Sequence, residues 1–210
     1  MKKLILFSLL ASLFFACNNS SSGDSENKYG IESGMITYKS NMMGMEIITT
    51  QYFKEHGDIE AVVTEMEMMG QKSKQHSLRK EGFYYSYTEG QTEGTKIKID
   101  EPKDSVDAQK LTEANIIKKG GKKLGEEELL GKSCNIYEFT EAGATTKVWI
   151  WKNMLIKMQA KQGEMEVTME ATELKETSDF PGGTFDVPAN VNFKEMQDQP
   201  TDFNDPNAEG

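Results

Sequence analysis

The sequence predicts a mostly β (α+β) fold, in which an antiparallel meander of about ten strands is crossed by one helix near residues 105–119. Three observations support this prediction. Apolar and polar residues alternate along many short segments, which is the period of a strand with one buried face. Turn residues separate neighbouring segments, so consecutive strands pair antiparallel. A single segment breaks this period and carries helix-capping residues instead.

The alternation is clearest in residues 165–171, where Met165, Val167, Met169 and Ala171 share one face and acidic or hydroxyl residues share the other. A sheet with one wet face needs few apolar residues, which explains how an apolar-poor chain can still fold. Similar patterns predict strands near residues 34–41, 45–54, 58–68, 71–79, 82–88, 94–100, 132–140, 145–152, 154–161 and 164–174.

The helical segment begins at Ser105, whose hydroxyl can cap a helix N-terminus, and Asp107 lies in the first turn. Lys118 and Lys119 suit the negative end of the helix dipole, and Gly120 can take the left-handed conformation that ends a helix. We therefore expect one helix near residues 105–119 that crosses the sheet.

The composition excludes several classes of protein. With 34 acidic and 24 basic side chains in 210 residues, the formal net charge is −10, which opposes general nucleic-acid binding. Two cysteines cannot build a disulfide scaffold, and two histidines leave little material for a metal site. The length suits one domain with tails.

The N-terminus predicts export. Lys2 and Lys3 precede an apolar run over residues 4–15, which is shorter than the roughly 20 residues of a membrane-spanning helix. The run ends in Phe14-Phe15-Ala16-Cys17, which resembles the end of a lipoprotein signal peptide. That resemblance implies cleavage between Ala16 and Cys17, and a thioether diacylglycerol with an N-acyl chain, such as palmitate, on Cys17. An ordinary signal peptide with an incidental cysteine is the alternative.

This organisation predicts a lipoprotein signal peptide (1–16), a lipidated flexible tether (17–30), a folded domain (31–193) and an acidic disordered tail (194–210). Loss of Lys2 and Lys3 leaves 22 basic against 34 acidic side chains, a net charge of −12. Asn18 follows the cysteine where some inner-membrane lipoproteins carry an acidic retention signal. The resemblance therefore favours the outer membrane, at its periplasmic face or its surface.

The second half of the chain contains four notable runs: Gly131-Lys132-Ser133-Cys134-Asn135-Ile136-Tyr137, Lys147-Val148-Trp149-Ile150-Trp151-Lys152, Leu155-Ile156-Lys157-Met158 and Phe185-Asp186-Val187-Pro188-Ala189-Asn190-Val191. In these runs the chain resembles bacterial envelope lipoproteins of unknown function in the outer-membrane lipoprotein carrier superfamily (LolA, LolB and LppX type). The resemblance implies a curved sheet that forms a half-open barrel with an apolar cavity between sheet and helices. Known members bind lipid or acyl chains.

The sequence contains few candidates for catalysis, since it has no nucleophile elbow, HExxH sequence, phosphate loop or CxxC pair. His56 falls in an expected turn and His76 in a polar strand, so both are expected at the surface without metal. Cys134 shares a strand side with Ile136, which favours a buried, unreactive thiol. Residues 126–128 are three glutamates that we expect in a solvated loop. We expect no catalytic, cofactor or metal site.

The thirteen methionines allow three interpretations. They can fill the core in place of leucine, line an adaptable apolar cavity, or bind Cu(I) through thioether sulfurs. The copper interpretation would use Met42, Met43 and Met45, or the triplet of Met66, Met68 and Met69. For a cavity, the expected lining residues are Met158, Met165, Met169, Trp149 and Trp151. The two tryptophans can equally belong to a central strand packed on both faces.

The leading hypothesis is a non-enzymatic, lipid-anchored envelope protein that binds an apolar ligand or a lipoprotein acyl chain between sheet and helix. The alternative is a structural or interaction module with a closed core. Copper binding is a remote alternative, and an enzyme ranks last. The expected partners are the membrane, through the N-terminal lipid, and a lipid or lipoprotein ligand, with no nucleic acid. The sequence leaves the oligomeric state open.

Overall fold

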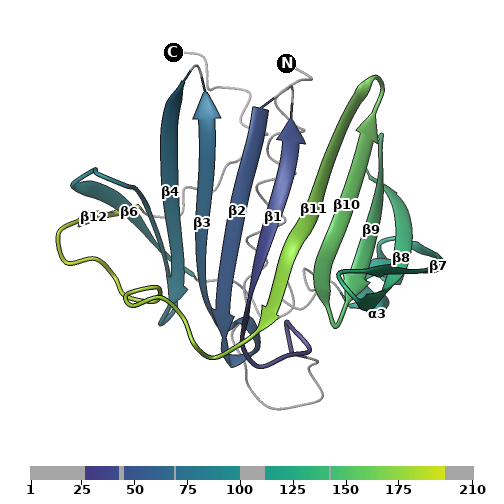
Figure 1. Cartoon of the computed structure of the whole chain (residues 1–210), viewed down its shortest axis with the longest axis horizontal. Helices are drawn as coiled ribbons and strands as arrows, with labels where there is room; N and C mark the ends of the chain where they lie inside the picture. The colour runs from purple at the N-terminus through teal and green to yellow at the C-terminus, as the bar shows by residue number, and fades with distance from the viewer. Residues whose placement is uncertain (1–26, 43–44, 69, 100–111, 142, 197–210) are drawn as a thin grey trace, which may run out of the picture.

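The computed structural model describes residues 27–42, 45–68, 70–99, 112–141 and 143–196. In these residues twelve strands form one open sheet with the order β12-β6-β5-β4-β3-β2-β1-β11-β10-β9-β8-β7 (Figure 1). The mostly β, antiparallel fold expected from the sequence is therefore confirmed.

Two antiparallel meanders make up the sheet. The first contains β1 (Gly34–Met42), β2 (Met45–Lys54), β3 (Ile59–Met68), β4 (Gln71–Lys80), β5 (Phe83–Thr88) and β6 (Glu93–Lys98). The second contains β7 (Lys122–Leu129), β8 (Lys132–Glu141), β9 (Ala144–Trp151), β10 (Met154–Gln162) and β11 (Met165–Glu176). β1 pairs with β11 and so joins them, while β12 (Asn192–Met196) adds to β6 in parallel.

The ten expected strands are all present, but the expected number was too low because two edge strands escaped the pattern. β7 contains the three glutamates that we expected in a loop, and most of its side chains are exposed on both faces. β12 is also exposed along most of its length and extends into the segment expected as a tail. An edge strand with little buried surface shows no apolar alternation, so the sequence signal is absent there.

The helix content is smaller than expected. Within the described residues, the one α-helix is α3 (Glu113–Lys118), whose N-terminus is capped by the Thr112 side chain accepting from the Asn115 backbone N–H at 3.3 Å. Gly120 follows with φ of 83°, as expected for the helix end. Residues 105–111 of the expected helix lie outside the described part. A short 3-10 turn, η1 (Glu55–Gly57), connects β2 to β3.

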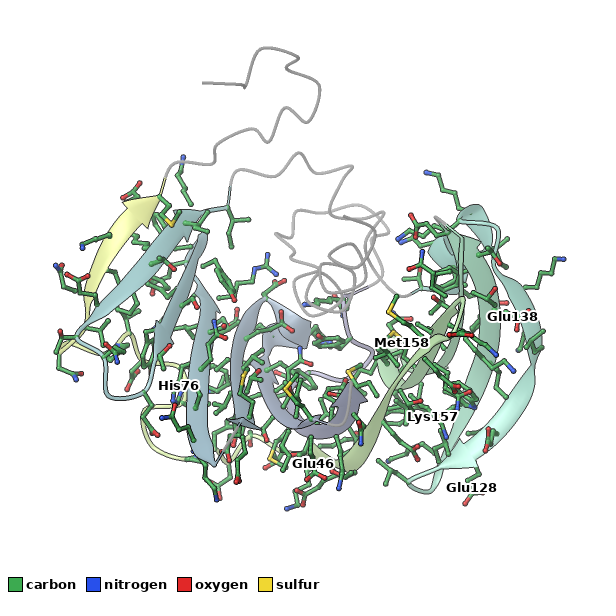
Figure 2. All side chains as sticks on the ribbon, turned by 90° about the horizontal axis from the view of Figure 1, so that it is seen from above. Glu46, His76, Glu128, Glu138, Lys157 and Met158 are labelled. Carbon is green, nitrogen blue, oxygen red and sulfur yellow. The ribbon has the colours of Figure 1, made fainter. Side chains whose placement is uncertain are left out.

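The sheet is curved, and its two faces differ in chemistry. We call the face of Ile36, Tyr38, Met158 and Met169 the inner face, and the face of Glu46 and Lys157 the outer face. Figure 2 shows the curved sheet from above, with Lys157 and Glu46 on its convex side. The register pairs Met158 with Met169 and Met169 with Ser40, so the inner face is continuous across the junction of the two meanders.

The core lies mainly on the inner face of the second meander and of β1. Val167, Met169 and Ala171 are buried while Glu166 and Thr172 are exposed, which confirms the alternation predicted for residues 165–171. Helix α3 adds Ile116 to this core. No helix in the described ranges is long and apolar enough to cross a membrane.

We predict that Met169→Ala lowers the free energy of unfolding by about 2–5 kcal/mol, because the truncation leaves a cavity among fully buried neighbours. The neighbouring Glu170→Ala should change it by less than about 1 kcal/mol, since Glu170 makes a partly exposed ion pair with Lys157 at 3.0 Å. Urea unfolding of the two variants measures the difference. Equal effects would contradict the assignment of the inner face as the core.

Candidate functional site: the inner face of the sheet

The apolar part of the inner face spans β1 and the second meander. Met158 pairs with Met169 on one side and with Val148 on the other, and Val148 pairs in turn with Tyr137. All four side chains are almost fully buried. Period-two alternation in four neighbouring strands therefore builds a continuous apolar wall from residues far apart in sequence.

A buried polar cluster adjoins this wall in the first meander. The Lys28 ammonium pairs with Glu60 Oε2, while Glu60 Oε1 accepts from the Tyr29 hydroxyl at 2.7 Å and from Gln51 Nε2 at 2.6 Å. Gln51 also donates to the Tyr29 oxygen at 2.7 Å. Each of these four side chains is buried, so the charges are compensated by a complete network.

The electrostatics of the cluster follow from its burial. Burial, reinforced by the negative charge of Glu60 and by the hydrogen bond to it, holds the pKa of Tyr29 well above its usual value. The pKa of Tyr38 is also raised, first by burial and then by Glu60. Both hydroxyls therefore stay protonated at neutral pH and act as hydrogen-bond donors rather than as bases.

Residues 28–31 position this cluster by crossing one end of the sheet. The Tyr29 N–H donates to the His56 carbonyl at 3.0 Å, and the Gly30 N–H donates to the Lys152 carbonyl at 2.8 Å. His56 lies in the β2–β3 connection and Lys152 in the β9–β10 turn, so the segment bridges the two meanders. Tyr29 then packs on Phe53 with ring centroids 4.6 Å apart.

The five residues expected to line a cavity do not share one face. Met158 and Met169 lie on the inner face, and each is only 1% exposed. Met165 also belongs to the inner face but is half-buried at the start of β11. Trp149 and Trp151 lie on the opposite, outer face of β9, since Val148 faces inward.

The tryptophans are held by charged partners on the outer face. Trp149 Nε1 donates to Glu127 Oε2 at 2.6 Å, and the Lys157 ammonium lies 5.3 Å from the Trp149 ring centroid. The ammonium groups of Lys132 and Lys152 lie 4.5 and 4.7 Å from Trp151 ring centroids. The central strand β9 is thus packed on both faces, as one interpretation of the sequence expected.

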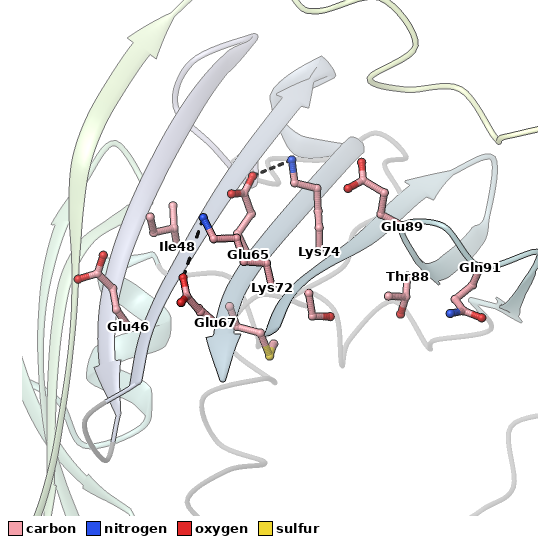
Figure 3. A pocket seen from close by; sticks show the side chains of 11 residues that line it. Glu46, Ile48, Glu65, Glu67, Lys72, Lys74, Thr88, Glu89 and Gln91 are labelled. Carbon is pink, nitrogen blue, oxygen red and sulfur yellow. Dashed lines mark ion pairs between the residues drawn. The ribbon is translucent and has the colours of Figure 1, made fainter. Parts of the chain in front are cut away.

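A charged groove of about 630 Å³ lies at the far ends of β2 to β5 (Figure 3). Its walls carry cross-strand ion pairs between Glu65 and Lys74 at 2.8 Å and between Glu67 and Lys72 at 4.0 Å. Ile48 and Met66 are its apolar lining residues. This groove differs in place and in chemistry from the apolar cavity that we expected between sheet and helix.

The described residues offer no group of three or more His, Cys, Asp or Glu side chains that could hold a metal ion. His76 stacks on Tyr87 with centroids 4.8 Å apart, and burial lowers its pKa. His56 Nδ1 lies 3.1 Å from the Tyr29 carbonyl oxygen. Cys134 is buried as predicted, and burial raises the pKa of its thiol, which makes the nucleophilic thiolate scarce.

Several expected sites lie outside the described residues. These are the Ala16–Cys17 cleavage and lipidation site and the side chains of Met42, Met43, Met68 and Met69 from the two copper triplets. Of those triplets, Met45 and Met66 are described, and both are half-buried.

The Lys28–Glu60 network was missed by sequence reasoning, although one signal pointed to it. Glu60 alternates with Val62 on the same side of β3, and such a carboxylate must find a partner if that side is buried. Lys28 could not be identified as that partner, because it lies in the segment expected to be a flexible tether.

Comparison with known proteins finds similarity in the fold but not in the sequence. In sequence, no family model and no curated protein matches this chain. In structure, the chain is similar to an uncharacterized conserved protein from Thermus thermophilus, with a TM-score of 0.57, 10% identity, and coverage of 89% of this chain and 99% of that one. It is also similar to a chain of the MucA/MucB complex of Pseudomonas aeruginosa, with a TM-score of 0.50 and 12% identity.

The second match covers 76% of this chain and 57% of the other, so this chain spans little more than half the length of that structure. These two likenesses show that the fold of this chain is shared with those structures. At these identities they carry no information about ligand or activity.

We predict that Glu60→Gln lowers the free energy of unfolding by about 3–5 kcal/mol, because it leaves the Lys28 charge buried without a carboxylate. The double variant with Lys28→Met should recover part of this loss, since it removes both charges. Glu46→Gln is the matched control, because Glu46 pairs with Lys39 at 2.6 Å with both side chains about half exposed. It should cost less than about 1 kcal/mol. Chemical unfolding distinguishes these outcomes, and a Glu60→Gln chain as stable as the control would contradict the role of the network.

Proposed function

We propose that this protein is a lipid-anchored component of the bacterial cell envelope that binds an apolar ligand, such as a lipid or a lipoprotein acyl chain, on the inner face of its sheet. The proposed role is binding without catalysis. Membrane attachment through Cys17, at the outer membrane, is part of the proposal and comes from the signal-peptide resemblance.

The observation that carries the proposal is the continuous apolar wall on the concave side of an open sheet. Met158, Met169 and Val148 form its centre, and two of these three are methionines. All three are almost fully buried, so the proposed ligand reaches them only when the residues that cover the wall move aside. Unbranched thioether side chains adapt to ligands of different shape, so they suit a wall that must accommodate flexible acyl chains. The resemblance of the sequence to LolA-type proteins supports the same class of function.

A second candidate function is an envelope interaction module that uses a closed core and binds a protein at its surface. The structurally similar MucA/MucB chain comes from a complex of two proteins, which makes a protein partner a reasonable second expectation here. The outer face also presents cross-strand ion pairs such as Glu65–Lys74, which give a charged surface for recognition. In this case the buried methionines serve only as core.

The binding proposal is tested by placing a larger side chain on the apolar wall. Ala160 faces inward and pairs with Val167, whereas the adjacent Gln159 faces outward. We expect Ala160→Trp to weaken binding of a fluorescent fatty acid by about tenfold or more, equivalent to about 1.4 kcal/mol, and Gln159→Trp to leave it unchanged. Fluorescence titration of the full chain gives the affinities, and the milder Ala160→Leu replaces the Trp variant if its melting temperature falls.

Native mass spectrometry of the same preparations supplies an independent readout. The proposal expects a lipid that co-purifies with the parent chain and is lost in Ala160→Trp. A parent chain that carries no lipid and binds no fatty acid would overturn the ligand proposal and favour the interaction module.

The anchor is tested separately with the two cysteines as a matched pair. We expect cells grown with an alkyne-labelled fatty acid to label the parent chain and the Cys134→Ala variant, and to leave Cys17→Ala unlabelled. The reason is that Cys134 is buried with a raised thiol pKa, while Cys17 occupies the lipidation position. Labelling that persists in Cys17→Ala would refute the anchor.

A further inference from the structure

The end of the sheet at which the chain enters the fold differs from the opposite end. The first described residue, Asn27, accepts a hydrogen bond through its backbone oxygen from Asn153 Nδ2 at 3.2 Å, in the β9–β10 turn. The β2–β3, β4–β5 and β7–β8 connections lie at this same end, because neighbouring strands alternate in direction. We call it the tether end.

Chain length keeps the tether end close to the proposed anchor. Asn27 lies ten residues after Cys17, and a span of that length reaches about 35 Å when fully extended. Flexible polar linkers of this length have a root-mean-square length of only about 18 Å. A tether of this length holds the end near the bilayer at a high effective concentration, so even a weak surface contact would be occupied.

Three two-residue turns at the tether end have left-handed backbone at both positions: Glu81-Gly82, Leu130-Gly131 and Lys152-Asn153. Such turns favour Gly, Asn and Asp, because other side chains are strained there. Leu130 has φ of 52° and is nevertheless 44% exposed. Leu130 therefore keeps an apolar side chain at a strained backbone position that suits Asn or Gly better, while burying only part of its surface, and an added contact outside the protein would account for this choice of residue.

Trp151 lies at the same end of the sheet as this leucine. It is the last residue of β9 and is only half-buried, and the ammonium groups of Lys132, at the start of β8, and of Lys152 both lie within 5 Å of its ring. Tryptophan flanked by lysine suits a membrane interface, because the indole enters the headgroup region while the lysine stems keep their charges in water.

Charge does not drive the contact. Lys132 is paired with Glu176 at 3.2 Å, and Glu55 and Glu81 are exposed at the same end. The surface is therefore of mixed sign, and its distinguishing feature is the pair of apolar side chains.

We propose that the tether end of the sheet rests on the membrane that carries the anchor, with Leu130 and Trp151 in the lipid headgroup region. This inference relies on the proposed anchor at Cys17. It gives the protein a fixed orientation, in which the turns at the tether end face the lipid and the charged groove of Figure 3 faces away from it.

The test uses the full lipidated chain in phosphatidylcholine vesicles whose acyl chains carry bromine, which quenches tryptophan fluorescence at short range. We expect the fluorescence of the parent chain to be quenched and the Trp151→Phe variant to lose most of that quenching. The tryptophan that remains, Trp149, is buried within β9 beside Lys157 and should not reach the lipid. Leu130→Asn should lower the quenching severalfold. Leu124→Asn is the matched control, because Leu124 is 51% exposed on β7 away from the turn, and it should leave the quenching unchanged.

Three further measurements make the outcome decisive. Leu130→Asn should keep or raise the unfolding midpoint, since asparagine suits the left-handed turn, so a loss of quenching cannot be ascribed to unfolding. Quenching should persist at about 1 M salt, where charge contacts are screened within about 3 Å. Vesicle flotation reports the anchor itself. A chain that floats with the vesicles but is not quenched overturns the orientation and leaves the anchor intact, whereas a chain that does not float overturns both.

Discussion

The pairing of β1 with β11 is the constraint on which the rest of the structure depends. It brings Ser40 beside Met169, and through it two separate meanders become one sheet with one continuous inner face. Without this pair, the apolar residues of β8 to β11 and the polar cluster near β3 would belong to different sheets. A register shift between Thr37 and Tyr38 lies within this pairing, and bulges of this kind bend a sheet.

The Lys28–Glu60 network fixes the segment that enters the fold against one end of the sheet. It attaches the segment that leads from the proposed anchor to β3, while Gly30 attaches the same segment to the β9–β10 turn. A buried ion pair is a poor source of stability in itself, but breaking one is costly. The network therefore specifies where the tether joins the fold, and this position underlies the proposed orientation on the membrane.

Particular residues show how much of the fold the sequence predicts. Met165, Val167, Met169 and Ala171 were placed on one face from alternation alone, and ten of the strands were predicted with bounds close to those observed. β7 and β12 escaped prediction, because edge strands bury little and so carry no alternating signal. The tryptophans were assigned to one strand face correctly, but their grouping with Met158 and Met169 required knowledge of which face turns inward.

The sequence by itself determined ten of the twelve strands of the described residues and many of the turns between them, and it predicted the export signal, because these depend on neighbouring residues, local periodicity and short motifs. Only the tertiary structure decided which strands flank one another, which face is concave, and that Lys28 meets Glu60. These depend on pairings between residues far apart in the chain. Period-two alternation looks alike in every strand that shows it, so it marks a buried face without identifying the neighbouring strand. The tether end, which gathers Leu130 and Trp151 from separate turns and strands, is a product of that long-range pairing.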